Sequence, residues 1–271
     1  NLEYIFSRRH DEVIAPIGKN ITKACFANVQ WITRKLAEMY LGADGLPIHN
    51  PNSTVGVNYS SPQQEYAKRD NRMNNTLMIP GNRYWNNNAP HTTWTDADKA
   101  AFDNKPFYPT SGSGYHNQKW ATERDVKDTY EGYDFPVIRY AEVLLNEAEA
   151  AARQGDKDLA LKKLNEVRDR SLADPASQTY KANDFADTKA LTEAILWERR
   201  IEFHGEGRRW EDIHRLAADD LCPSGGIPAK IEYNNTKGQG AFVVGGEVKS
   251  EWFGSNKAFI PYTDKRFIWP I

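Results

Sequence analysis

Apolar residues recur at helical spacing in the segment that begins at Pro136. Proline suits the first turn of a helix, where its missing N–H leaves no hydrogen bond unmade. The pattern predicts one amphipathic helix of about four turns. Its apolar face comprises Val137, Ile138, Ala141, Leu144, Leu145, Ala148, Ala151 and Ala152. Its polar face comprises Arg139, Glu142, Asn146, Glu149 and Arg153.

A second helix is expected directly after the first. Gly155 can adopt the left-handed conformation that ends a helix, and Asp156 can cap the next one. Ala160, Leu164 and Val167 then repeat the apolar stripe. Because the connection is so short, the two helices should run antiparallel and in contact.

Helical hairpins of this kind are the unit of tetratricopeptide arrays, in which small alanines allow close approach of the helices. The sequence contains one visible copy. Since such repeats normally need at least three units for stability, we expect the N-terminal repeat half of the array to lie outside this chain.

A third predicted helix carries two glutamates inside its apolar stripe. Glu198 and Glu202 fall on the face formed by Leu191, Ala194, Ile195, Trp197 and Ile201. Buried carboxylates need cationic or hydrogen-bonding partners. The nearest cations along the chain are Arg199, Arg200, Arg208 and Arg209.

Two glycines, Gly205 and Gly207, let the backbone turn after this helix, so that later residues can fold back toward the carboxylates. We therefore predict a structural ion network of Glu198, Glu202, Arg208, Arg209 and Asp212. The alternative is a general acid/base pair among Glu198, Glu202 and Glu206, as in glycoside hydrolases. Adjacent arginines disfavour that alternative, because they depress the carboxyl pKa values.

Aromatic residues gather between residues 84 and 135, interleaved with Pro, Gly, Asn and Thr at no helical or strand period. Together with the polar stretch from residue 50, they predict long loops over residues 50–135. Aromatic rings beside amide and guanidinium groups suit sugars, whose ring faces stack while their hydroxyls need fixed partners. The predicted ligand-binding residues are Arg83, Tyr84, Trp85, Asn86, Asn88 and Trp94. The alternative is that these aromatics only pack the loops onto the helices.

Composition and charge exclude several other classes. A net charge of -2 and a pI near 6.4 provide no electrostatic footprint for nucleic acid or an anionic membrane. The sequence shows no signal peptide or membrane-spanning run. His204 and His214 lack a third ligand for zinc, and no cofactor fingerprint is present. Cys25 and Cys222 are read as two thiols, with a long-range disulfide as the alternative in an oxidising compartment.

Six elements, in order, resemble the C-terminal half of the SusD/RagB family. Residues 44–48 read Asp-Gly-Leu-Pro-Ile, and residues 69–72 read Arg-Asp-Asn-Arg, followed by Pro80-Gly81. The other four elements are the helical segment from Val137 to Asn146, Glu198 to Phe203, Glu206 to Asp212, and the closing Pro270-Ile271. Two departures are small: Glu147 stands where an aromatic is common, and His204-Gly205 replaces a bulkier pair.

This resemblance implies a mainly α fold: a tetratricopeptide-like helical hairpin plus a helical, loop-rich C-terminal region with little β structure. Residues 1–271 would form a single C-terminal domain, with loops over 50–135 and the helical signature region over 136–216. It also implies a lipid-anchored protein on the outer membrane, with the anchor outside this chain. Such a protein captures a glycan or other nutrient for a TonB-dependent, SusC-like transporter, without a cofactor or catalysis.

Three hypotheses therefore stand: a nutrient-binding lipoprotein, a helical-repeat scaffold for protein partners, and a glycan-cleaving enzyme. The scaffold does not explain residues 50–135. The enzyme needs opposed carboxylates that the sequence does not place.

Overall fold

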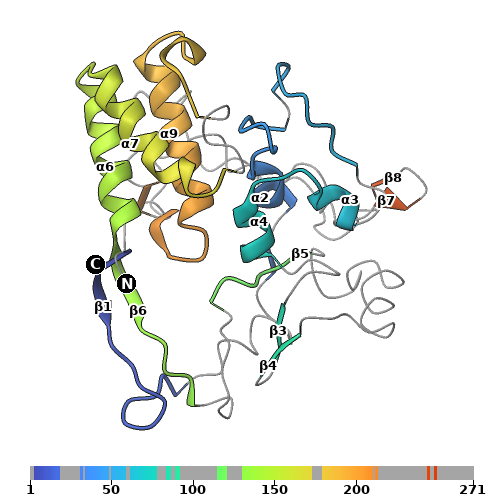
Figure 1. Ribbon diagram of the computed structural model, residues 1–271, viewed down its shortest axis with the longest axis vertical. Helices are drawn as coiled ribbons and strands as arrows, with labels where there is room; N and C mark the ends of the chain where they lie inside the picture. Colours follow the sequence, from blue (N-terminus) through green and yellow to red (C-terminus); the bar gives the residue numbers. More distant parts are fainter. Residues whose placement is uncertain are drawn as a thin grey trace, which may run out of the picture.

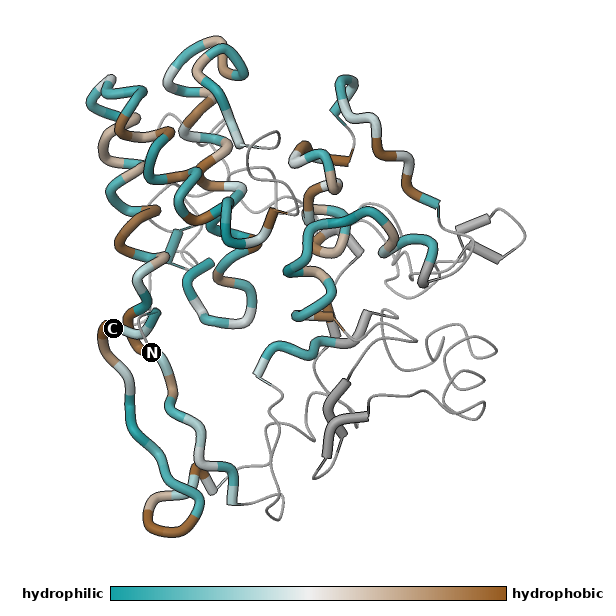
Figure 2. Tube along the Cα trace, in the orientation of Figure 1, coloured by the Kyte–Doolittle hydropathy of each residue, from teal (hydrophilic) through white to brown (hydrophobic). Residues whose placement is uncertain are grey.

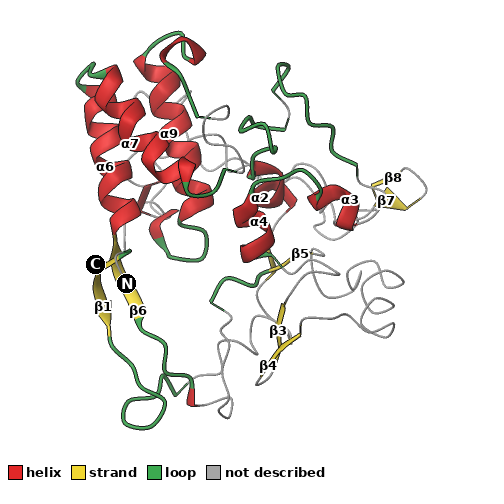
Figure 3. Cartoon of the chain, viewed as in Figure 1, coloured by secondary structure: helices red, strands yellow, loops and turns green. Residues whose placement is uncertain are grey.

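The computed structural model describes residues 3–18, 31–32, 34–48, 50–58, 62–77, 84–86, 89–91, 115–120, 130–172, 179–209, 211–212, 243–244 and 247–248. Within them helices dominate, and the strands form two-stranded pairs (Figure 3).

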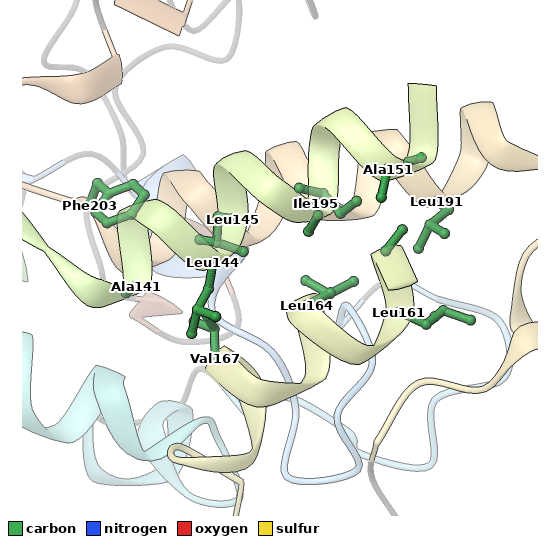
Figure 4. Close-up of a cluster of buried hydrophobic side chains, with 13 residues drawn as sticks. Ala141, Leu144, Leu145, Ala151, Leu161, Leu164, Val167, Leu191, Ile195 and Phe203 are labelled. Atoms are coloured by element: carbon green, nitrogen blue, oxygen red, sulfur yellow. The ribbon is translucent and has the colours of Figure 1, made fainter. Parts of the chain in front are cut away.

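Three helices, α6, α7 and α9, lie side by side and form the largest helical unit (Figure 1). They span Tyr140–Arg153, Lys157–Asp169 and Thr188–Glu202, with the 3-10 turn η2, Ala182–Asp184, ahead of α9. Figure 2 shows apolar and polar positions alternating around these helices. The buried residues of their shared core are aliphatic except for Phe203 (Figure 4), and they include Ala141, Leu144, Leu145, Ala148, Ala151, Ala152, Ala160, Leu161, Leu164, Val167, Leu191 and Ile195.

The helix ends match their predicted signals. Gly155 has a φ of +87°, and the Asp156 carboxylate accepts a hydrogen bond from the Leu159 N–H at 3.0 Å. Asp187 caps α9 in the same way through the Ala190 N–H at 2.8 Å. The predicted helical hairpin, formed by α6 and α7, is thereby confirmed.

The start of the first helix was predicted wrongly. Phe135–Arg139 is a strand, β6, which pairs antiparallel with β1, Tyr4–Arg8, and α6 begins only at Tyr140. Pairing with a strand near the start of the chain overrides the local helical signal. Proline is tolerated here because each strand of a two-stranded ribbon has an unpaired edge. Val137 and Ile138 are consequently part-exposed, whereas Arg139 and Glu149, predicted on the polar face, are buried.

A second core lies beside the helical unit. It is built on α2, Arg34–Met39, α3, Pro62–Tyr66, and α4, Asn71–Thr76. Ile201 of α9 joins this cluster, and the Trp197 indole N–H donates to the Met39 carbonyl at 2.9 Å, so α9 contacts both cores. The cluster comprises Ile32, Ala37, Met39, Tyr40, Leu41, Tyr66, Met73, Leu77 and Ile201.

The region predicted as loops contains short regular elements. Helices α3 and α4 lie within residues 50–135, and β3, Tyr84–Asn86, pairs antiparallel with β4, Ala89–His91. These short elements depend on local turns and on contacts between distant segments, and neither produces a hydrophobic period in the sequence. The remaining strand pairs are β2, Trp31–Ile32, with β5, Tyr115–His116, and β7, Val243–Val244, with β8, Glu247–Val248.

Across the described part of the chain, each helix is too short or too polar to cross a membrane.

Candidate functional site

Glu198 and Glu202 of α9 are buried, as their place in the apolar stripe predicts. The two residues expose 1% and 5% of their surface. Burying a carboxylate that far from water is costly unless cations and hydrogen bonds compensate it. Their partners therefore decide whether this is a structural network or a reactive pair.

Arg72 joins both glutamates to α4. Its guanidinium contacts the Glu198 carboxylate through Nη1, and the same nitrogen lies 3.1 Å from Glu202 Oε2. Its Nη2 lies 2.7 Å from Asp70 Oδ2, and Asp70 also caps α4 by accepting from the Arg72 backbone N–H. Arg72 thus links α4 to α9, because it contacts Asp70 at the start of α4 and both glutamates of α9.

Arg139, the last residue of β6, holds Glu202 from the opposite side. Its Nη1 lies 2.9 Å from Glu202 Oε1 and 2.6 Å from Glu3 Oε1. Its Nε and Nη2 donate to the two oxygens of Glu206 at 2.9 and 2.8 Å. This bidentate pair is the geometry in which arginine binds a carboxylate most strongly.

Two arginines at the end of α7 complete the network. Arg168 is 1% exposed, and its Nη1 lies 3.5 Å from Glu198 Oε2 while its Nη2 donates to the Gly45 carbonyl at 2.8 Å. Its guanidinium also lies 3.6 Å from the centre of the Tyr180 ring, a cation–π contact. Arg170 Nη2 lies 2.6 Å from Glu202 Oε1.

The arginines set the ionisation of Glu202. Burial by itself raises the pKa of this carboxyl, but Arg72, Arg170 and Arg139 outweigh burial and hold its pKa well below the usual range. The carboxylates correspondingly raise the pKa of Arg72 and of Arg139 against the opposing effect of burial. Glu202 is therefore a fixed anion at neutral pH, which is the opposite of what a general acid needs.

The remaining predicted members of the network have other partners. Arg208 pairs with Glu142 at 3.0 Å and donates to the Val137 carbonyl, and Arg209 is half-buried in the same turn. Asp212 is buried and pairs with Arg199 at 3.0 Å. Gly205 and Gly207 have φ values of +74° and +81°, so the predicted turn exists. After this turn, however, Asp212 contacts Arg199, and Arg208 contacts α6.

Glu198 and Glu202 are thus paired with arginines from other elements, and Arg208, which was predicted to join them, pairs with Glu142. The actual cations come from α4, β6 and α7, with Lys119 beside Glu206. Long-range packing selects these partners. The available signal was Asp70 in the Arg-Asp-Asn-Arg segment, because an aspartate is a typical N-cap and would place Arg72 in the first turn of a helix.

Residues 117–120 bind to the end of α9. Lys119 Nζ contacts the Glu206 carboxylate and donates to the Glu202 carbonyl at 2.9 Å. Trp120 Nε1 donates to the Gly205 carbonyl at 2.9 Å, and its ring stacks on Phe135 with centroids 5.4 Å apart. Trp120 has a φ of +76°, a left-handed conformation that costs an ordinary residue about 1–2 kcal/mol.

His204 and Asn117 provide a further contact in this region. The His204 Nε2–H donates to Asn117 Oδ1 at 3.0 Å. Burial and the neighbouring positive charge of Lys119 lower the pKa of His204 to about 4. The imidazole is therefore neutral at pH 7. Among the described residues, no group of three His, Cys, Asp or Glu side chains is placed to hold a metal ion.

A cavity of about 590 Å³ lies next to the network. Its walls come from β1, α4, residues 119–120, residues 133–139, the end of α7 and the end of α9. Tyr4, Trp120, Tyr133 and Ile201 provide apolar surface, and Asn71 and Asn75 provide amides. This cavity was not predicted from the sequence, since its walls come from separate segments spread between Glu3 and Glu206.

Three of the six predicted ligand-binding residues lie in the β3–β4 hairpin. Tyr84, Trp85 and Asn86 form β3, with Tyr84 paired to His91, Trp85 to Pro90 and Asn86 to Ala89. Arg83, Asn88 and Trp94 lie outside the described residues, as do Cys25, Cys222, His214 and the closing Pro270-Ile271.

Comparison with known proteins identifies the family. The model of the SusD family matches residues 6–271. No curated protein matches the chain. Among solved structures, a SusD-like protein from Bacteroides fragilis NCTC 9343 aligns at 24% identity with a TM-score of 0.52, over 80% of this chain and 44% of that one. The selenomethionine structure of BT4246 aligns at 17% identity with a TM-score of 0.55, over 80% and 41%.

The chain therefore spans less than half the length of these solved relatives. At such identities the structures establish a shared, SusD-like fold, dominated by helices. The family model covers nearly the whole chain and includes the helices and the arginine–glutamate network described above. On these grounds the chain belongs to the SusD family.

Proposed function

We propose that this chain is part of a cell-surface lipoprotein that captures a glycan or similar nutrient and delivers it to a TonB-dependent, SusC-like transporter of the outer membrane. The observation that carries this proposal is the match of the family model from residue 6 to residue 271. A lipid anchor outside this chain would hold the protein at the membrane. The pairing of Glu198 and Glu202 with arginines supports a structural role for these carboxylates and a binding role for aromatic residues elsewhere.

The glycan-cleaving alternative is disfavoured by the ion network. A glycosidase needs one carboxyl kept protonated and a second kept ionised across a cleft. Glu202 instead contacts Arg72, Arg139 and Arg170, and Glu198 contacts Arg72 and Arg168. Glu202 is held as an anion, and the Glu198 carboxylate is fixed between two arginines, so we infer binding without cleavage.

The β3–β4 hairpin is the first place where we expect ligand to bind. Its strand β3 contains Tyr84, Trp85 and Asn86, and Arg83 and Asn88 are close to them in the sequence, a combination of rings, amides and a guanidinium that suits a sugar. Since consecutive residues of a strand belong to opposite faces, Tyr84 and Trp85 should not stack on the same sugar ring. We therefore expect one of them to dominate, with Trp94 as a second platform.

Calorimetric titration with polysaccharides tests the hairpin. A screen of the whole chain on a glycan array first identifies a ligand, which is then titrated against Trp85→Ala, Tyr84→Ala and Trp94→Ala. Loss of the dominant ring should weaken binding at least thirtyfold, about 2 kcal/mol. Tyr130→Ala, which removes an exposed ring outside the hairpin, is the matched control. Wild-type affinity in all three variants would place the glycan elsewhere.

The scaffold alternative predicts a different outcome. If the chain only presents helices to protein partners, the glycan array stays negative, and the full-length protein does not purify with a TonB-dependent barrel. Our proposal expects both a glycan signal and co-purification with the barrel from solubilised outer membranes.

A further inference from the structure

The cavity between α4, Trp120 and the end of α9 is separate in sequence from the β3–β4 hairpin and has no role in the function proposed above. We propose that it binds a short neutral saccharide of one or two rings. This inference rests on the proposed function for the class of ligand, whereas the site itself is supported by the residues that line the cavity.

The size of the cavity suits a small ligand. The volume of about 590 Å³ falls within the roughly 300–1,000 Å³ of small-molecule sites. The mixture of walls is also typical of such sites, which combine apolar surface with a few polar groups that fix orientation. Tyr4, Trp120, Pro136 and Ile201 form the apolar part.

Charge is the second argument, and it selects a neutral ligand. Four cations line the cavity, namely Arg72, Lys119, Arg139 and Arg170. Four carboxylates also line it, namely Glu3, Asp134, Glu202 and Glu206. The formal charge of the walls is therefore zero. Each cation is already in an ion pair within 3.5 Å of a carboxylate, so a charged ligand would have to compete with an existing partner.

The position of Trp120 is the third argument. Its left-handed backbone conformation suits glycine or asparagine far better than a bulky aromatic residue, and such outliers often occur at binding sites. The stack on Phe135 and the hydrogen bond to Gly205 fix the plane of the ring at the cavity wall. A ring held in place in advance loses little entropy when a sugar stacks on it.

Two amides on α4 supply the polar contacts. Asn71 and Asn75 are one helical turn apart, are exposed, and both line the cavity. Each amide offers a carbonyl oxygen and an NH₂ group, which suit hydroxyls that both donate and accept. A stacking ring and two amides on the walls of one cavity suit the proposed ligand class.

The experiment titrates the 271-residue chain with glucose, galactose, mannose, N-acetylglucosamine, maltose and cellobiose, using saturation-transfer NMR and calorimetry. Glucuronate is the charged probe. We expect at least one neutral sugar to bind and glucuronate to bind at least tenfold more weakly than glucose. Trp120→Gly, which keeps the backbone conformation without strain, should weaken the neutral sugar at least tenfold.

Asn71→Ala is the second variant, because it changes an exposed amide and leaves the fold intact even if Trp120→Gly reduces stability. It should also weaken the bound sugar at least tenfold, whereas Asn52→Ala, an exposed amide outside the cavity lining, should not. Binding that is unchanged in both cavity variants, or the absence of binding by every sugar, overturns the proposal.

Trp85→Ala separates this inference from the proposed function. A cavity ligand should bind this variant normally. If polysaccharide binding depends on Trp85 while no small sugar binds, the cavity proposal fails and the proposed function stands. If small sugars bind through Trp120 while the glycan array is negative, the hairpin assignment fails and the cavity stands.

Discussion

The two ends of α9 are stabilised in different ways. Near its start, Leu191 and Ile195 pack into the aliphatic core shared with α6 and α7. Near its end, Glu198 and Glu202 sit equally deep but are surrounded by arginines from three other elements. The aliphatic end depends on shape and volume, whereas the charged end depends on every partner being present. We therefore expect the start of α9 to tolerate substitutions that its end does not tolerate.

Arg168→Ala should give the largest loss of stability. It removes a cation from Glu198, a donor from the Gly45 carbonyl and the stacking partner of Tyr180. Breaking one side of a buried ion pair typically costs about 3–5 kcal/mol. Urea denaturation of the variant measures the change in the free energy of unfolding. Glu147→Ala, which removes an exposed carboxylate 3.1 Å from Lys163, is the control and should cost less than about 1 kcal/mol.

Leu145→Ala on α6 tests the aliphatic core into which the start of α9 packs, and should cost about 3 kcal/mol through lost burial and the cavity that remains. Leu145→Met keeps the volume and should cost under about 1.5 kcal/mol. The same denaturation measurement compares them. If the conservative exchange is as damaging as the truncation, the aliphatic end is not the tolerant region.

Much of the aliphatic end could be predicted from sequence, because its information is local. The spacing from Ala141 to Ala152, the Gly155 turn and the Asp156 cap all lie within one hairpin, and all are found in the structure. The predicted helical start at Pro136 failed because β1, more than 120 residues earlier, pairs with that segment.

The charged end could be predicted only in part. Burial of Glu198 and Glu202 follows from helical phase, but their partners Arg72, Arg139 and Arg168 are chosen by the packing of α4, β6 and α7 against α9. No spacing rule connects residues 72 and 198. The cavity beside them was missed for the same reason, since its walls meet only in the folded chain.

Acid should affect the charged end before the aliphatic one. The pKa of His204 in the folded chain is about 4, below its value of about 6.5 in the unfolded chain. As pH falls from 7 to 5, the unfolded chain takes up this proton and the folded chain does not, so stability falls by roughly 1–2 kcal/mol. Denaturation curves at both pH values measure the loss. His204→Gln should reduce it, and an unchanged loss would assign the titration to another group.

We infer that the buried carboxylates of α9 hold the fold and take no part in ligand chemistry. Glu198→Gln tests it most directly, because Glu198 lies in the ion network but not among the residues lining the cavity. Melting temperature, glycan affinity and glycan chain length are measured on one preparation. We predict a clearly lower melting temperature, wild-type affinity below that temperature, and no change in chain length for either protein. An unchanged melting temperature with lost binding, or glycan cleavage by the wild type that the variant lacks, would contradict the claim.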